Sequence, residues 1–96
     1  MTVKIMIKRK VPKQKKPEFL KLINGLRTEA IKQPGYISGE ALSNVDNPEQ
    51  YLVISTWSSP EEWQAWKASK KRTELQAKID SLLDGKTQYD VYQYLP

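Results

Sequence analysis

Three tryptophans lie within ten residues, in the segment W57-S-S-P-E-E-W-Q-A-W66. An aromatic wall with a few polar groups is typical of sites that bind small, flat, apolar ligands. Trp57 and Trp63 are expected to be core residues that fill this corner of the protein. Trp66 is then the best candidate for a pocket wall, with polar Arg72 and Gln76 expected close to it.

Two residue types that commonly do chemistry are missing, because the chain contains no cysteine and no histidine. The first absence excludes disulfides, thiolate nucleophiles and cysteine metal sites. The second excludes the commonest general base, metal ligand and haem ligand. We therefore expect no metal and no histidine-dependent catalysis.

The chain has 96 residues, which predicts one domain spanning residues 1–96. No apolar run approaches the length that spans a membrane, and Lys4 interrupts the apolar N-terminal run that a signal peptide would continue. We expect a cytoplasmic protein with no membrane contact.

The net charge of +5 comes from one segment. Residues 8–16, KRKVPKQKK, hold six basic residues and no acid, which leaves ten basic against eleven acidic residues elsewhere. A local cluster of this kind predicts a solvated loop, with an anion contact as the alternative. It does not predict a nucleic-acid-binding face.

Alternation of apolar and polar residues predicts strands at residues 3–11 and 87–95, and a further strand is expected at residues 36–45. The continuous apolar start of residues 51–57 predicts a strand that is covered on both faces. Residues 12–16 are expected to form a loop, and helical spacing predicts a helix from Pro17 that ends before Pro34. A second helical region begins at Pro60, is broken by the basic run 70–72, and ends near Gly85. Ser59 and Glu62 have the spacing of a capping box at its start.

The element order is therefore β-α-β-β-α-β, which is typical of the ferredoxin-like α+β plait: an antiparallel four-stranded sheet with helices on one face. The other face would expose Met6, Ile37, Leu52, Ile54, Tyr92 and Tyr94. So much apolar surface predicts a homodimer packed sheet to sheet. RNA-recognition domains share this order, but the third strand lacks their glycine and basic start, so we expect no nucleic-acid partner.

Three segments carry a family resemblance: P34-G-Y-I-S-G-E40, D46-N-P-E-Q-Y-L-V-I-S-T-W57 and S59-P-E-E-W-Q-A-W-K-A-S69. Together they resemble the antibiotic biosynthesis monooxygenase (ABM) family of dimeric ferredoxin-like proteins. The resemblance implies a homodimer whose sheets pack into a barrel, with a pocket between the sheet and the helices of each chain. Some members oxygenate polycyclic phenols, anthrones or quinols with molecular oxygen and without metal or flavin, and others degrade haem.

Residue by residue, the resemblance does not support haem degradation. The haem-degrading branch uses an Asn on the first strand, a Trp on the second helical region and a His ten residues later. Trp66 matches the Trp, but Gln76 stands where the His is required, and the first-strand position falls near Lys8 or Arg9. Quinol-oxidising relatives carry His where Trp66 and Lys71 stand here.

The resemblance implies a cofactor-independent monooxygenase that acts with O2 on a small phenol, quinol or anthrone-like aromatic. The expected substrate-binding residues are the rings of Trp66 and Trp63, the cations Arg9 and Arg72, and the amide of Gln76. Judged alone, each arginine is expected on the surface. Glu40, Asp90 and Tyr51 are open alternatives for a base. The alternative function is a non-catalytic dimer of the same fold that binds a small ligand or is purely structural.

Overall fold

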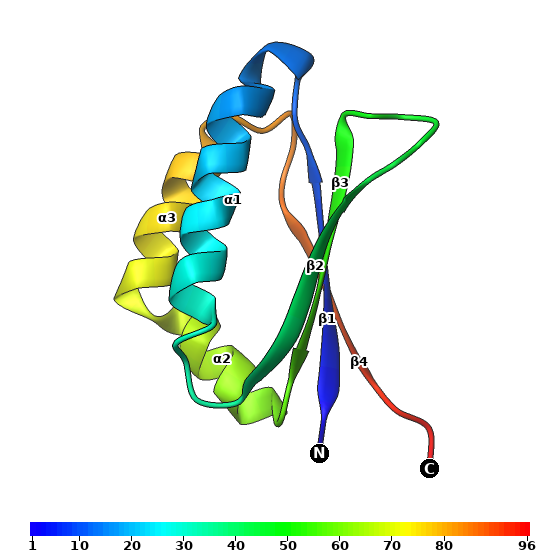
Figure 1. Cartoon of the computed structure of the whole chain (residues 1–96), viewed down its shortest axis with the longest axis vertical. Helices are drawn as coiled ribbons and strands as arrows, with labels where there is room; N and C mark the ends of the chain where they lie inside the picture. Colours follow the sequence, from blue (N-terminus) through cyan, green and yellow to red (C-terminus); the bar gives the residue numbers. More distant parts are fainter.

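Four strands form the sheet, and the first of them alternates buried residues with more exposed ones. The computed structural model describes residues 1–96, with strands β1 (Val3–Lys10), β2 (Tyr36–Ser43), β3 (Gln50–Trp57) and β4 (Gln88–Gln93). They form one sheet in the order β2-β3-β1-β4, and every neighbouring pair is antiparallel. The helices cover one face of this sheet (Figure 1). The predicted ferredoxin-like α+β fold is confirmed.

The helices are η1 (Lys13–Lys15), α1 (Lys16–Ala30), α2 (Pro60–Ala68) and α3 (Lys70–Asp80). The loop predicted after Val11 is wrong for Lys13–Lys15, which form a 3-10 turn leading directly into α1. Pro12 prepares this turn, because its ring fixes φ near the helical value. No helix combines the length and the apolar composition needed to cross a bilayer.

The second helical region is broken as predicted, but the predicted position of the break at residues 70–72 is wrong. Ser69 alone interrupts the region with an extended ψ of 149°, and Lys70–Arg72 form the first turn of α3. The Ser69 hydroxyl caps α3 by accepting a hydrogen bond from the Arg72 backbone N–H at 3.3 Å. This cap fixes the start of the helix that carries Arg72.

The predicted cap of α2 is confirmed, because the Ser59 hydroxyl accepts from the Glu62 backbone N–H at 3.2 Å. The Glu62 carboxylate in turn accepts hydrogen bonds from the hydroxyls of Ser59, at 3.0 Å, and Ser58. The carboxylate lies over Gly35, and a Cβ at position 35 would collide with it. Gly35 also has a φ of +86°, which favours glycine. The Ser58 N–H donates to the Gly35 carbonyl at 2.8 Å, so this corner joins the α1–β2 turn to the β3–α2 turn.

Glu62→Gln tests the contribution of this corner to stability. The serine hydroxyls lower the pKa of the Glu62 carboxyl below its ordinary value. A lowered folded-state pKa stabilises the fold above the unfolded pKa, and this stability is lost as the pH falls through the folded pKa. We expect the Gln variant to be less stable than wild type at pH 7 and the gap to close in acid. Urea unfolding at pH 7 and pH 3 checks this, and an equal gap at both pH values would contradict it.

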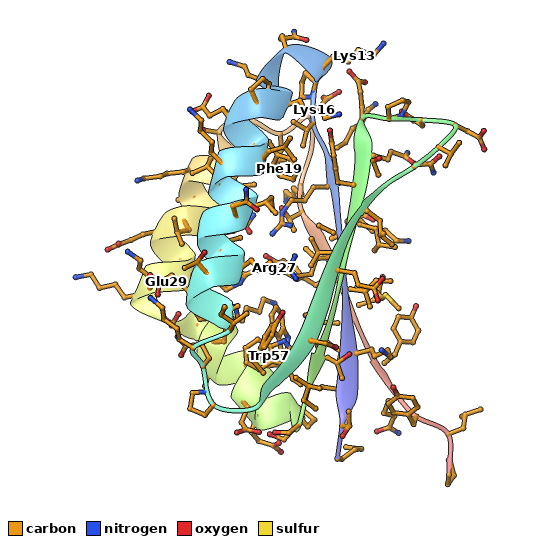
Figure 2. All side chains as sticks on the ribbon, viewed as in Figure 1. Lys13, Lys16, Phe19, Arg27, Glu29 and Trp57 are labelled. Carbon is orange, nitrogen blue, oxygen red and sulfur yellow. The ribbon has the colours of Figure 1, made fainter.

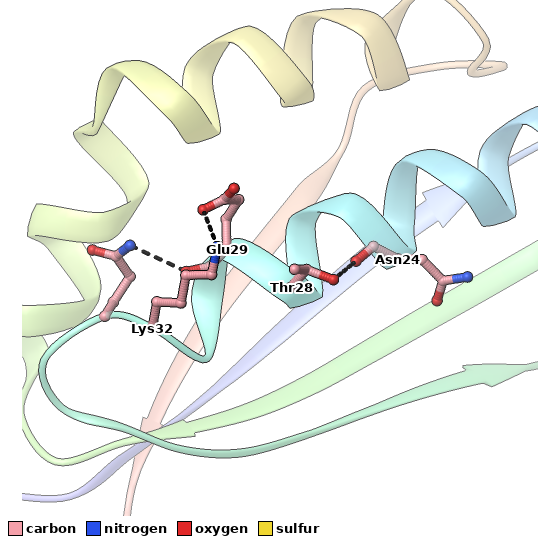
Figure 3. A network of polar contacts seen from close by, with 5 residues as sticks. Asn24, Thr28, Glu29 and Lys32 are labelled. Atoms are coloured by element: carbon pink, nitrogen blue, oxygen red, sulfur yellow. Dashed lines mark hydrogen bonds and ion pairs between the residues drawn. The ribbon is translucent and has the colours of Figure 1, made fainter.

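Side-chain contacts close the C-terminal end of α1 (Figure 3). The Thr28 hydroxyl donates to the backbone carbonyl of Asn24 at 2.9 Å, and the side-chain amide of Gln33 donates to the backbone carbonyl of Glu29 at 3.1 Å. Lys32 Nζ lies 3.6 Å from the Glu29 carboxylate. These contacts hold the last turn of α1 before the chain enters β2.

The core lies between the helices and the inner face of the sheet, where Phe19 and Trp57 are found (Figure 2). On β1 it takes every second residue, Val3, Ile5 and Ile7, which are 2%, 0% and 5% exposed. The helices thus bury one face only.

The outer face of the sheet carries apolar residues that no element of the chain covers. Of the residues predicted for this face, Met6, Leu52 and Ile54 are half-buried, and Tyr92 and Tyr94 are exposed. Leu42, which was not predicted, is also exposed there. The sixth predicted residue, Ile37, is exposed at a β-bulge between Tyr36 and Ser38. We call Met6, Leu42, Leu52, Ile54 and Tyr92 the outer apolar face.

The basic segment 8–16 is part of β1, η1 and α1 and is not one solvated loop. Lys8 and Lys10 are exposed on β1, while Arg9 between them is buried. Lys10 Nζ lies 3.7 Å from the Asp84 carboxylate, and the Lys13 backbone N–H donates to the Glu49 carboxylate at 3.1 Å. Most of its lysines therefore face solvent, as predicted, but its arginine does not.

Candidate functional site

A cavity of about 70 Å³ lies between the helices and the inner face of the sheet. Its walls come from every helix that covers the sheet and from β1, β2 and β3. They are Ile7, Arg9, Ile23, Leu26, Arg27, Ala30, Tyr36, Gly39, Glu40, Ala41, Val53, Ser55, Trp57, Trp63, Trp66 and Arg72. Because a water molecule needs about 10–15 Å³ by this kind of measure, the cavity holds several waters or one compact ring.

The cavity opens between α1 and the edge strand β2. Arg27 of α1 and Glu40 and Ala41 of β2 line it and are exposed to solvent. Figure 2 shows Arg27 on the side of α1 that faces β2. A second hollow lies between the same two elements and shares Ile23, Ala41 and Val53 with the first. A ligand larger than one ring would have to extend from the cavity into this second hollow.

All three tryptophans are both core residues and walls of this cavity. Trp57, Trp63 and Trp66 are 1%, 2% and 4% exposed. The Trp57 and Trp63 ring centroids are 6.0 Å apart, and Tyr36 packs edge-on against Trp57 at 5.5 Å. The proposed division between core Trp57 and Trp63 and pocket-lining Trp66 is therefore not seen, because all three contact the same space.

Arg9 and Arg72 also line the cavity, and their expected surface placement is wrong. They are 4% and 3% exposed. Arg9 follows Val3, Ile5 and Ile7 on the inner face of β1, and the alternation of the strand buries it. The stems of arginines pack well among apolar residues while their guanidinium groups require polar partners.

The polar partners of the two buried guanidinium groups are neutral side chains. Arg9 Nη2 donates to Gln76 Oε1 at 2.7 Å, and Arg72 Nη2 donates to the Tyr89 hydroxyl at 3.0 Å. The Arg72 guanidinium also lies 5.4 Å from the Trp63 ring and 5.3 Å from the Tyr89 ring, within cation–π range.

Neither buried arginine has a carboxylate partner, since the two ion pairs of the chain are Lys10–Asp84 and Lys32–Glu29. Burial lowers the pKa of Arg9 to about 10, and the charge of Arg72 adds to this effect against the opposing influence of Tyr89 and Asp80. With a pKa of about 10, the Arg9 guanidinium is still charged near neutral pH. The cavity is thus apolar and aromatic with two uncompensated positive charges behind it.

Gln76 lies beside the cavity and does not line it. It is 9% exposed, and its amide nitrogen donates to Asp80 at 2.7 Å and to Thr87 at 2.9 Å while its oxygen accepts from Arg9. Gln76 thus holds the Arg9 guanidinium in position.

The three candidate bases do not gather at the cavity. Asp90 is exposed on β4 opposite Met6, on the outer face of the sheet. Tyr51 packs on Phe19, with ring centroids 4.8 Å apart, and is not part of the cavity wall. Glu40 lines the mouth, but its register opposite Ile54 belongs to the outer face.

The sequence interpretation missed Tyr36 and Tyr89. Tyr36 lines the cavity above Gly39, where an added Cβ would lie 2.6 Å from the tyrosine hydroxyl. Tyr89 faces the helices from β4 opposite Ile7, which strand alternation could have indicated. The described chain contains no group of three or more His, Cys, Asp or Glu side chains that could hold a metal ion.

A curated relative matches part of the chain. Protein SchA from Streptomyces halstedii is 33% identical over 52 residues, which cover 54% of this chain and 14% of SchA. The chain therefore corresponds to a small part of that protein's length.

Solved structures match the whole fold at low sequence identity. A conserved protein from Methanosarcina mazei has a TM-score of 0.91 at 22% identity, covering 97% of this chain and 92% of its own. SnoaB from Streptomyces nogalater, described as a cofactor-independent oxygenase, has a TM-score of 0.88 at 15% identity, covering 99% and 94%. At these identities the likeness shows a shared fold.

The family model described as antibiotic biosynthesis monooxygenase matches residues 2–78, which include β1, α2 and the cavity-lining part of α3. The match covers most of the chain and agrees with the sheet order and with the structural neighbours. The chain belongs to the antibiotic biosynthesis monooxygenase family.

Proposed function

We propose that the protein is a cofactor-independent monooxygenase that uses O2 to oxidise a small aromatic substrate of the phenol, quinol or anthrone class. One observation carries the proposal: two buried guanidinium groups without carboxylate partners lie behind an aromatic-walled cavity. Buried charges are normally paired, so this arrangement favours a ligand that is, or becomes, an anion.

The first chemical step is the ionisation of the bound substrate. Two cations in a poorly hydrated site stabilise a phenolate or enolate, and so lower the pKa of the substrate in the cavity. Glu40, Asp90 and Tyr51 are not positioned on the inner wall to take the proton. In this proposal the proton passes to water at the mouth between α1 and β2, and Arg9 and Arg72 replace a dedicated base.

The second step is the transfer of one electron from the anion to O2, which gives a substrate radical and superoxide. Their combination forms a C–O bond and, after protonation, a hydroperoxide. Loss of water from the hydroperoxide leaves a carbonyl, so that a CH2 group and O2 become C=O and H2O overall. The protein contributes orientation by Trp63 and Trp66, electrostatic stabilisation of the anion and exclusion of bulk water.

Family membership supports this proposal, as does the shared fold with SnoaB, although a likeness at 15% identity shows the fold alone. We further propose that the working unit is a homodimer formed through the outer apolar face, since Met6, Leu52 and Ile54 are uncovered at the centre of the sheet. This assembly would leave the mouth between α1 and β2 on the other side of the sheet.

A ligand-binding protein without turnover is the second candidate. The observation that favours it is that the inner wall of the cavity carries no carboxylate, since Glu40 lies at the mouth. Such a protein would still bind an aromatic anion at the arginines, but it would not accelerate its reaction with O2.

Oxygen uptake with reduced naphthoquinols and anthrones tests the proposal. We expect uptake above the uncatalysed rate, and we expect Trp66→Leu to lower kcat/KM by about tenfold because the flat wall that orients the ring is lost. Lys71→Met is the control. Lys71 is near Trp66 in the sequence, but it is exposed on α3 and does not line the cavity. Tight binding with no uptake across the panel would favour the second candidate.

A further inference from the structure

Arg9 is linked to a carboxylate only through an intervening amide. Arg9 Nη2 donates to Gln76 Oε1 at 2.7 Å, and Gln76 Nε2 donates to Asp80 Oδ1 at 2.7 Å. The same amide nitrogen donates to the Thr87 hydroxyl at 2.9 Å. One network therefore holds a guanidinium and a carboxylate that form no ion pair with each other.

The orientation of the Gln76 amide follows from its two charged neighbours. An ionised carboxylate only accepts hydrogen bonds, and a guanidinium only donates them. The amide nitrogen of Gln76 must therefore face Asp80, and the amide oxygen must face Arg9. Because the amide fits between the two charges in one orientation only, it fixes the guanidinium of β1 to α3.

The network holds Arg9 without neutralising it. Arg9 is buried, whereas Asp80 is exposed to solvent at the end of α3. Burial has the largest influence on the pKa of Arg9, followed by Tyr89 and Arg72, and Asp80 has the smallest influence of the four. The outer carboxylate thus compensates little of the charge on Arg9.

A direct carboxylate partner would be the ordinary arrangement for a buried guanidinium, because buried charges are normally paired. Glutamate has the length of glutamine, so position 76 could supply one. The chain instead has a neutral amide there and leaves Arg9 Nε, at the cavity, without an acceptor. The indole N–H of Trp63 is the other buried side-chain donor that has none.

We propose that Gln76 is a positioning residue whose neutral amide fixes the Arg9 guanidinium and keeps the carboxylate of Asp80 away from it, so that the charge of Arg9 acts on an anion in the cavity. The inference rests on the proposed function, since it explains how the same cavity stabilises that anion. Gln76 acts through Arg9 and does not itself line the cavity.

An exchange of the two side-chain groups tests this directly. Gln76→Glu/Asp80→Asn moves the carboxylate to position 76 and the amide to position 80, so the net charge of the chain is unchanged. The new carboxylate can accept from Arg9, from the amide at position 80 and from the Thr87 hydroxyl, so the network keeps its hydrogen bonds. The change that remains is a negative charge placed directly on Arg9.

The pKa of bound 4-nitrophenol measures the charge at the cavity without turnover. The phenol and the phenolate absorb at different wavelengths, so absorbance across a pH series gives the pKa of the bound probe. We expect wild type to hold this pKa below that of the free probe and the exchange to raise it by about one pH unit or more. Tyr89 and Arg72, which also act on Arg9, are unchanged in both proteins. Equal probe pKa values in both proteins, or a wild-type value equal to that of the free probe, would overturn the proposal.

Gln76→Met is the matched control, because it removes the amide without bringing a carboxylate to Arg9. We expect it to weaken binding of the probe, since the guanidinium is no longer held, but to keep the pKa of the bound probe close to the wild-type value. If this variant raised the probe pKa as much as the exchange does, the effect would come from loss of the amide and the proposal would fail.

Asp80→Asn provides the test if the exchanged protein does not fold. Because the amide separates Asp80 from Arg9, the probe pKa should stay within about half a pH unit of wild type. A fall of a full unit would show that Asp80 already neutralises Arg9 across the amide, which would refute the proposal.

The pH dependence of oxygen uptake connects this inference to the reaction. We expect the exchange to lower kcat/KM by about tenfold or more near neutral pH and the loss to shrink as the pH rises, because the substrate then ionises without help. Damage to the fold would lower uptake equally at every pH, and that result would contradict the proposal. A shifted probe pKa with no oxygen uptake by wild type would support this inference and count against the oxygenase.

Discussion

Arg9→Met should give a more stable protein that has lost most of its activity. In the folded chain the pKa of Arg9 is lowered to about 10, well below the ordinary value of an arginine, because burial penalises the charged form. A folded pKa below the unfolded one means that the protonated side chain opposes folding at every pH below about 10. At 1.36 kcal/mol per pKa unit, this cost is on the order of 3 kcal/mol.

Methionine keeps a long apolar stem and removes the charge. It also leaves Gln76 Oε1 without its donor, which costs about 1 kcal/mol. The expected net effect is a gain of about 1–2 kcal/mol, or a rise in Tm of several degrees. Removal of one charge that stabilises the anion should lower kcat/KM by about a hundredfold.

Thermal unfolding and oxygen uptake on the same preparations check both halves of this prediction. Lys71→Met again serves as the control, because it removes one positive charge from an exposed position and should change neither quantity much. A marked loss of stability in Arg9→Met would instead show that Arg9 serves the Gln76, Asp80 and Thr87 network as a structural group.

The element order was predictable because each element has a strong local signal. Alternation marked β1 and β4, an apolar run marked β3, and Ser59 with Pro60 marked the start of α2. The burial of Arg9 was also encoded, since Arg9 continues the Val3, Ile5, Ile7 alternation. Arginine was nevertheless expected on the surface, because arginines are rarely buried in proteins. An arginine in line with buried residues of a strand is itself an indication of a site.

Other features depend on tertiary structure that no local pattern encodes. The cavity exists because α1 and the edge strand β2 leave space between them, and because Gly39 lets the Tyr36 side chain lie along β2. Which indole N–H finds an acceptor depends on the position of Ser55 relative to Trp57. The family resemblance indicated a pocket between sheet and helices, but it did not distinguish Trp63 from Trp66.

Ile54→Asp should convert a dimer into a monomer. Ile54 lies at the centre of the outer apolar face, opposite Met6 on β1 and Glu40 on β2. A stable interface of standard size buries about 800 Å² on each partner, and a sheet face of this kind can supply it. A carboxylate at its centre would lie unpaired next to the same face of the second copy, and such a buried charge costs several kcal/mol.

Light scattering coupled to size-exclusion chromatography checks this at micromolar concentration. We expect wild type at twice the mass of one chain and Ile54→Asp at the mass of one chain. Ala65→Asp, which places the same charge on the exposed side of α2, should remain dimeric. A monomeric wild type would refute assembly through the outer apolar face. A dimeric Ile54→Asp would place the interface elsewhere on the chain, and the mouth between α1 and β2 would then be the first region to test.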